Sequence, residues 1–130
     1  IKKIILDYNP LIQIFSSEYT PTNLEKFNIN SNYLVFSGIG NPKNFKKTLK
    51  DNNFKTVEFN SFPDHYNYTN NDIEKIKTKA KNLNAKILTT KKDYMRLSKN
   101  NSKDIEYLDI KLKIKNKDEL INFIKSQIWK

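Results

Sequence analysis

From residue 33 onward, short apolar runs alternate with segments in which apolar residues recur every three or four positions. Runs rich in Val, Ile, Leu and Phe predict buried strands, whereas the longer spacing predicts amphipathic helices. The predicted strands are 33–36, 54–59, 85–88 and 105–114, and the predicted helices are 42–52, 70–83, 92–97 and 118–128. This alternation favours an open α/β domain, in which helices flank a mostly parallel, Rossmann-like sheet.

Residues 1–32 do not follow this rhythm. They contain Pro10, Pro21 and two apolar patches, so we expect a short strand or hairpin and a linker there. The predicted organisation is a linker segment over 1–32 and an α/β domain over 33–130. The length of 130 residues is typical of one domain. Because the chain begins with Ile1 and not with methionine, we expect it to be part of a longer protein.

The net charge of +10 has two interpretations. Lys, Asn and Ile have A/T-rich codons and make up 58 of the 130 residues, so the lysines can reflect codon bias and form a solvated surface. A positive field would equally attract anionic partners such as nucleic acid, a membrane surface or a phosphorylated substrate. Only Arg96 is arginine, although proteins that read phosphates and bases usually rely on arginine.

Composition excludes several kinds of site. The chain has no cysteine, which excludes disulfides, thiolate metal sites and cysteine nucleophiles. One histidine cannot form a histidine-rich metal cluster, and no stretch approaches the roughly 20 apolar residues of a membrane span. Neither a full G-x-G-x-x-G fingerprint nor the P-loop pattern G-x-x-x-x-G-K-[ST] occurs in the chain, so the sequence alone predicts no complete phosphate-binding loop.

Three polar segments follow predicted strands, and ligands bind at the carboxyl ends of the strands in such sheets. The first segment contains Gly38, Gly40 and Asn41, followed by Pro42 at the start of a predicted helix. Backbone amides at a helix N-terminus can bind a phosphate or another anion. The alternative is a sharp strand-to-helix turn in which Asn41 is the N-cap.

The second segment contains Asp64 and His65, the only histidine. Histidine titrates near neutral pH and can accept a proton from a hydroxyl group, with Asp64 beside it. The alternative is an ordinary loop histidine, with Asp64 as a turn or cap residue.

The third segment contains Thr90, Lys92 and Asp93, whose hydroxyl, ammonium and carboxylate groups suit phosphate contacts. Its alternative is a helix N-cap followed by solvated lysines.

In this order, the three segments resemble the C-terminal domain of the tetraacyldisaccharide 4'-kinase family. The resemblance covers about residue 31 to the C-terminus and rests on the runs VFSGIGNP-x-x-F (35–45), FPDH-x-x-Y (62–68) and LTT-x-KD-x-x-RL (88–97). The family usually has Glu where this chain has Lys91, which leaves the role of that position open.

The resemblance implies an activity for the longer protein. Members of the family use ATP and Mg²⁺ to phosphorylate the 4'-hydroxyl of a lipid A precursor, at the cytoplasmic face of the inner membrane of Gram-negative bacteria. An N-terminal P-loop domain, absent here, binds most of the ATP and Mg²⁺ in the family, so we expect this chain to contain no metal site and to be inactive alone. The implied partners are that domain, an anionic glycolipid substrate and the membrane surface.

The resemblance also implies residue roles. His65 would act with an aspartate of the other domain to deprotonate the sugar hydroxyl, and Asp64 would orient the loop. The residues that would face the cleft for substrate and nucleotide are Gly38, Gly40, Asn41, Thr90, Lys92 and Asp93.

Two other interpretations stay open. One is a stand-alone basic α/β module that binds nucleic acid; the absence of RNP, KH and helix-turn-helix signals and the single arginine speak against it. The other is a degenerate fragment that folds without activity.

Overall fold

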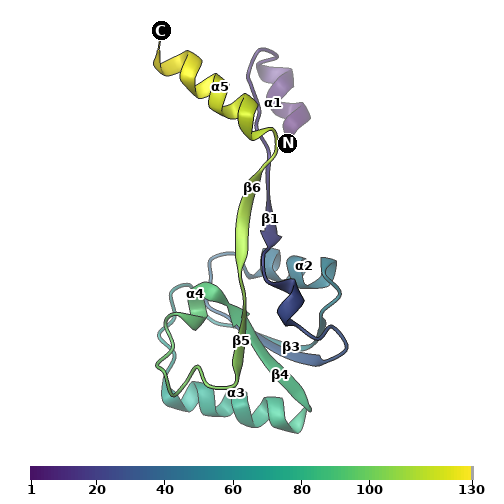
Figure 1. Cartoon of the computed structure of the whole chain (residues 1–130), viewed down its shortest axis with the longest axis vertical. Helices are drawn as coiled ribbons and strands as arrows, with labels where there is room; N and C mark the ends of the chain where they lie inside the picture. Colours follow the sequence, from purple (N-terminus) through teal and green to yellow (C-terminus); the bar gives the residue numbers. More distant parts are fainter. Residues whose placement is uncertain (130) are drawn as a thin grey trace. The chain divides into compact units, whose positions relative to one another are not determined.

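The computed structural model describes residues 1–129, and a four-stranded parallel sheet forms its largest unit (Figure 1). The sheet has the order β3-β2-β4-β5, and its three neighbouring pairs are all parallel. Its strands are β2 (Asn32–Ser37), β3 (Lys55–Ser61), β4 (Ala85–Thr90) and β5 (Ile105–Leu108). The predicted α/β fold with a parallel sheet flanked by helices is therefore confirmed.

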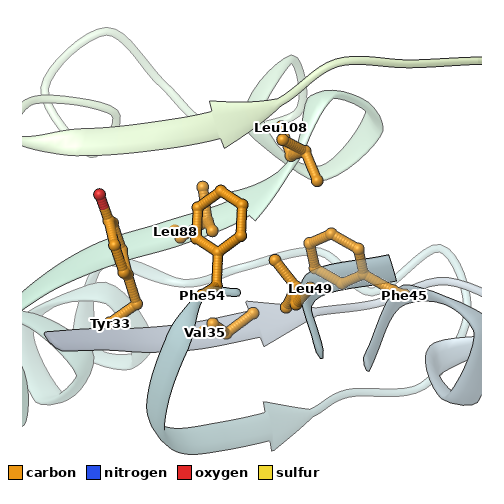
Figure 2. Packing of buried hydrophobic residues seen from close by; sticks show 7 residues of the cluster. All are labelled: Tyr33, Val35, Phe45, Leu49, Phe54, Leu88 and Leu108. Carbon is orange, nitrogen blue, oxygen red and sulfur yellow. The ribbon is translucent and has the colours of Figure 1, made fainter. Parts of the chain in front are cut away.

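Helices cover both faces of this sheet, because side chains of successive strand residues point to opposite faces. Tyr33 and Val35 of β2 pack with helix α2 (Pro42–Asp51), whereas Leu34 and Phe36 pack with helix α3 (Asn70–Asn82). Burying each large apolar side chain stabilises the fold by about 1.5–3 kcal/mol. Figure 2 shows the cluster on the α2 face, which comprises Tyr33, Val35, Phe45, Leu49, Phe54, Leu88 and Leu108.

Side-chain caps fix where these helices begin. The Asn41 side chain accepts a hydrogen bond from the Asn44 amide (3.1 Å), and Pro42 occupies the first helical position of α2. At α3, Thr69 and Asp72 form a capping box, as the sequence predicts. The two caps set the ends of the loops that precede α2 and α3, and these loops contain two of the three polar segments.

The strand order reverses beside β2. The chain passes from β2 to β3 on one side and then crosses back to β4 on the other side of β2. In open α/β sheets, such a reversal leaves a crevice at the carboxyl ends of the two central strands. Gly38 follows β2 directly and Thr90 ends β4, so both lie at this switch point.

The contacts of the chain divide it into two units. One runs from Pro21 to Lys111 and contains the parallel sheet; the other joins Ile1–Thr20 to the chain from Leu112 onward. In this grouping the C-terminal segment joins the N-terminal one, and the predicted boundary at residue 32 stays a prediction. Within the terminal unit, the Lys115 amide donates to the Ser16 carbonyl (2.8 Å), and the rings of Phe15 and Phe123 lie 5.6 Å apart.

The terminal segments differ from prediction in two ways. Helix α1 (Lys2–Tyr8) occurs where the sequence predicts a short strand or hairpin and a linker. The same region contains strand β1 (Ser17–Pro21) and the short 3-10 helix η1 (Leu24–Lys26). The single strand predicted over 105–114 is two strands, β5 and β6 (Ile110–Ile114), and β6 pairs with β1 in a separate sheet. Helix α5 (Lys117–Ile128) agrees with prediction.

The break between β5 and β6 has a local cause. The Asp109 amide donates to the Asn23 side chain (2.9 Å), and the Asp109 carbonyl accepts from the Thr22 amide (2.9 Å). Asp109 therefore bonds to the segment after β1 and not to β4, which ends the parallel sheet at Leu108. Among the described residues 1–129, no helix is both long and apolar enough to span a membrane.

Candidate functional site

The second polar segment packs directly on the first. If Gly38 had a Cβ atom, that atom would lie 3.0 Å from the Pro63 carbonyl oxygen and 3.0 Å from the Tyr68 hydroxyl. A Cβ on Gly40 would lie 3.2 Å from a carboxylate oxygen of Asp64. Both glycines are therefore explained by close packing of the loop 62–68 on the turn after β2. Neither requires a left-handed backbone.

The third segment joins this contact through Asp93, which is completely buried. Its carboxylate accepts hydrogen bonds from the Gly38 amide (3.1 Å), the Tyr68 hydroxyl (2.9 Å) and the Thr90 hydroxyl (2.6 Å). Hydrogen bonds to a charged group are about twice as strong as neutral ones. One side chain thus links the ends of β2 and β4 with the loop 62–68, so all three predicted segments converge.

Arg96 completes this network. It lies in the turn that follows α4 (Lys91–Tyr94), and its guanidinium donates to the Gly38 carbonyl (2.9 Å) and to the Asp93 carboxylate. The neighbouring Tyr68 hydroxyl has a pKa far above its ordinary value, first because it is buried and second because the Asp93 charge opposes ionisation. Tyr68 is therefore a hydrogen-bond donor to Asp93 at all physiological pH values.

His65 is held by its backbone and not by its side chain. Its amide donates to the Gly38 carbonyl (3.0 Å) and to the Asp64 carboxylate (3.0 Å), and its φ of 57° is in the left-handed region. The imidazole is 84 % exposed, with Nε2 3.9 Å from an Asp64 carboxylate oxygen. The loop therefore presents an accessible imidazole, accompanied by a carboxylate, at the carboxyl edge of the sheet.

The other predicted residues have different surroundings. Asn41 is the N-cap of α2, and Lys92 is exposed on α4. Lys91 forms an ion pair with Asp109 (2.7 Å), and this hydrogen bond raises the pKa of the Lys91 ammonium. Lys91, which stands where the family usually has Glu, is therefore paired with Asp109, the residue that separates β5 from β6.

The described residues contain no candidate cluster for Mg²⁺, and one turn at the switch point disfavours a phosphate. Among residues 1–129, no three His, Asp or Glu side chains are close enough together to hold a metal ion. At the N-terminus of α2, the Asp64 carboxylate lies against Gly40, where its charge opposes an incoming phosphate. The wider assignment of Gly38, Gly40, Asn41, Thr90, Lys92 and Asp93 to a substrate and nucleotide cleft stays a prediction.

Sequence reasoning missed the roles of Tyr68 and Arg96. Both occur in the motifs, but their bonds join residues that are 25 and 58 positions apart in the chain. Arg96 did carry a signal, because it is the only arginine beside 23 lysines.

Adding a methyl group at Gly38 should displace the loop that presents His65. We expect Gly38→Ala to lower the free energy of unfolding by about 1–3 kcal/mol, because the new Cβ meets a backbone carbonyl that cannot easily move. Gly40→Ala is the matched control, since its Cβ meets only the end of the Asp64 side chain. Urea denaturation of both variants measures the difference; equal effects would show that the loop does not pack tightly at Gly38.

The fold and the converging segments together define a Rossmann-like α/β domain with its polar residues at the topological switch point. A family model described as Tetraacyldisaccharide-1-P 4'-kinase matches residues 7–129. The chain therefore belongs to the tetraacyldisaccharide 4'-kinase family, a family of kinases, and the resemblance drawn from the three motifs is confirmed. This membership does not favour the nucleic-acid-binding interpretation.

Individual relatives agree with the family model. The tetraacyldisaccharide 4'-kinase of Pelagibacter ubique is 45% identical over 122 residues, which are 94% of this chain and 39% of that protein. The Rickettsia bellii protein of the same name is 47% identical over 87 residues, 67% of this chain and 27% of that protein. The chain thus spans well under half the length of these relatives.

A solved structure shows the same fold. It is the "apo" form of LpxK from Aquifex aeolicus in complex with ATP, with a TM-score of 0.53 and 23% sequence identity. The match covers 93% of this chain and 40% of that chain. The structural similarity therefore shows a shared fold.

Proposed function

We propose that this chain is the part of a tetraacyldisaccharide 4'-kinase that presents His65 to the sugar hydroxyl. The complete protein would transfer the γ-phosphate of ATP to the 4'-hydroxyl of a tetraacyldisaccharide 1-phosphate. The single observation that supports this most is the convergence of the three motifs on Asp93, which leaves the His65 imidazole exposed at the switch point.

In this proposal, the 4'-oxygen attacks the γ-phosphorus, the bond to ADP breaks, and the hydroxyl proton passes to His65. An aspartate of the other domain would share that proton with the imidazole. General-base assistance of this kind contributes about 10²–10⁴ in rate. Asp64 has a supporting role, because its carboxylate accepts from the His65 amide and lies 3.9 Å from the imidazole.

ATP and Mg²⁺ would be bound mainly by an N-terminal P-loop domain. The Asp64 carboxylate beside Gly40 supports this division, because its charge opposes a phosphate at the N-terminus of α2. This chain alone is then expected to bind Mg-ATP weakly and to transfer no phosphate.

The substrate and the membrane would both be anionic. A net charge of +10 favours approach to a phosphorylated glycolipid and to the anionic leaflet of a membrane. We therefore propose that the complete protein acts at the cytoplasmic face of the inner membrane as a peripheral protein.

A chimera tests the proposal. The part of the Pelagibacter ubique kinase that lies outside the match is joined to this chain and incubated with [γ-³²P]ATP and tetraacyldisaccharide 1-phosphate. We expect the chimera and the intact relative to label the lipid, and this chain alone to leave it unlabelled. A folded chimera that labels no lipid, beside an active relative, would contradict the proposed function.

A further inference from the structure

The single arginine of the chain is used inside the protein. The other 23 basic residues are lysines, yet position 96 has a guanidinium that is only 25 % exposed. Its Nη2 atom donates both to the Gly38 carbonyl and to the Asp93 carboxylate. Its Nε atom is buried and has no hydrogen-bond partner among residues 1–129. The arginine thus keeps one buried N–H group without a partner among the described residues, while its Nη2 atom bonds two acceptors.

The bonds of Arg96 and Asp93 meet at the Gly38 peptide groups. Asp93 accepts from the Gly38 amide, and Arg96 donates to the Gly38 carbonyl, so the ion pair holds both polar atoms of one glycine. The same carbonyl accepts from the His65 amide (3.0 Å). Because glycine has no side chain to restrict its rotation, its peptide groups need such external bonds to keep one orientation.

The His65 backbone depends on this carbonyl. A non-glycine residue at a φ of 57° is in a sparsely populated conformation and persists only where surrounding bonds enforce it. The two bonds to the His65 amide come from Asp64 within the loop and from Gly38 outside it. Gly38 therefore connects the loop to the rigid sheet.

We propose that the Arg96–Asp93 ion pair is a positioning device: through the Gly38 carbonyl it holds the His65 backbone and thereby the direction in which the His65 side chain leaves the loop. The effect on catalysis rests on the proposed function, whereas the effect on the His65 backbone is independent of it. Arg96 and Asp93 are then positioning residues of the kinase, because they act on the reaction through His65. A planar guanidinium suits this task better than an ammonium, because it is weakly hydrated and holds two acceptors in a fixed arrangement.

The geometric part can be tested on this chain by amide hydrogen exchange and NMR. In the native chain, we expect the His65 amide to exchange slowly, although it lies in an exposed loop. In Arg96→Lys, we expect its exchange to become about tenfold faster, with a shift of the single imidazole resonance. Glu58→Gln is the matched control, because it breaks the Lys79–Glu58 ion pair elsewhere on the same unit. Fast exchange in the native chain, or equal effects of the two variants, would overturn the proposal.

The catalytic part is tested in the chimera. Arg96→Lys should lower kcat about tenfold while the KM values for ATP and lipid stay nearly unchanged, since positioning affects the transition state more than binding. A loss of stability alone would reduce the folded fraction and leave kcat per folded molecule intact. If Arg96→Lys alters His65 exchange but His65 substitutions leave turnover normal, the proposed function fails and the positioning device stands.

Discussion

Replacing His65 by asparagine in the chimera is expected to lower kcat by about 10²–10⁴ and to leave the melting temperature almost unchanged. This loss corresponds to about 2.7–5.5 kcal/mol of transition-state stabilisation. The imidazole is 84 % exposed, so its removal uncovers little apolar surface. Asparagine keeps a hydrogen-bonding side chain and tolerates a φ of 57°, but it cannot accept the proton near neutral pH.

His65→Ala serves as a second variant with an additional effect. Alanine is strained in the left-handed region, so this variant should lose about 1–2 kcal/mol of stability besides the catalytic loss. Asn53→Ala is the matched control, because Asn53 has a φ of 60° after helix α2. Steady-state kinetics and melting curves of the three variants separate the two effects. Normal turnover in a well-folded His65→Asn chimera would rule out His65 as the proton acceptor.

The sequence predicts the sheet of this protein well, because its signals are local. The run 33–36 around Val35 is apolar throughout, and Ile87 and Leu88 are adjacent apolar residues, a pattern typical of strands buried on both faces. Asn41 before Pro42, and the spacing of Thr69 and Asp72, mark helix starts through bonds within one turn. Such signals need no knowledge of distant residues.

Local sequence signals do not predict helix α1 or the break at Asp109. Helix α1 has seven residues, no side-chain cap and no buried residue, so its sequence lacks the features that identify a helix. The alternation from Ile105 to Ile114 reads as one strand, and only Asn23 and Thr22, more than 80 positions away, interrupt it. Local patterns therefore fail where a distant segment competes for the same backbone groups.

The candidate site shows the same limit. The rule that ligands bind at the carboxyl ends of parallel strands is enough to group Gly38, His65 and Thr90 in one region of the sheet. It does not reveal that Asp93 is buried, because a carboxylate near a helix start is typically an exposed cap. Burial follows from the hydrogen bonds that Asp93 accepts from the Gly38 amide and the Tyr68 hydroxyl, which lie 55 and 25 positions away in the chain. The motif residues are thus predictable from the sequence, but the hydrogen-bonding centre among them is not.

Removing the Asp93 carboxylate should be the most destabilising single change at the site. We expect Asp93→Ala to lower the free energy of unfolding by about 3 kcal/mol, near the lower end of the range for breaking a buried ion pair, because Arg96 stays partly exposed. The variant also leaves the Tyr68 hydroxyl and the Gly38 amide without their acceptor.

Asp51→Ala is the matched control for this experiment. It deletes the same kind of side chain from the Lys47–Asp51 ion pair, whose carboxylate is 54 % exposed, and should change stability by about 0.5 kcal/mol or less. Urea denaturation compares the two variants, with equal m values showing that both unfold from the same compact state. Because a domain is stabilised by only about 5–15 kcal/mol in total, a loss of about 3 kcal/mol would shift the urea midpoint strongly. If Asp93→Ala shifted it no further than Asp51→Ala, Asp93 could not be the group that holds the three motifs together.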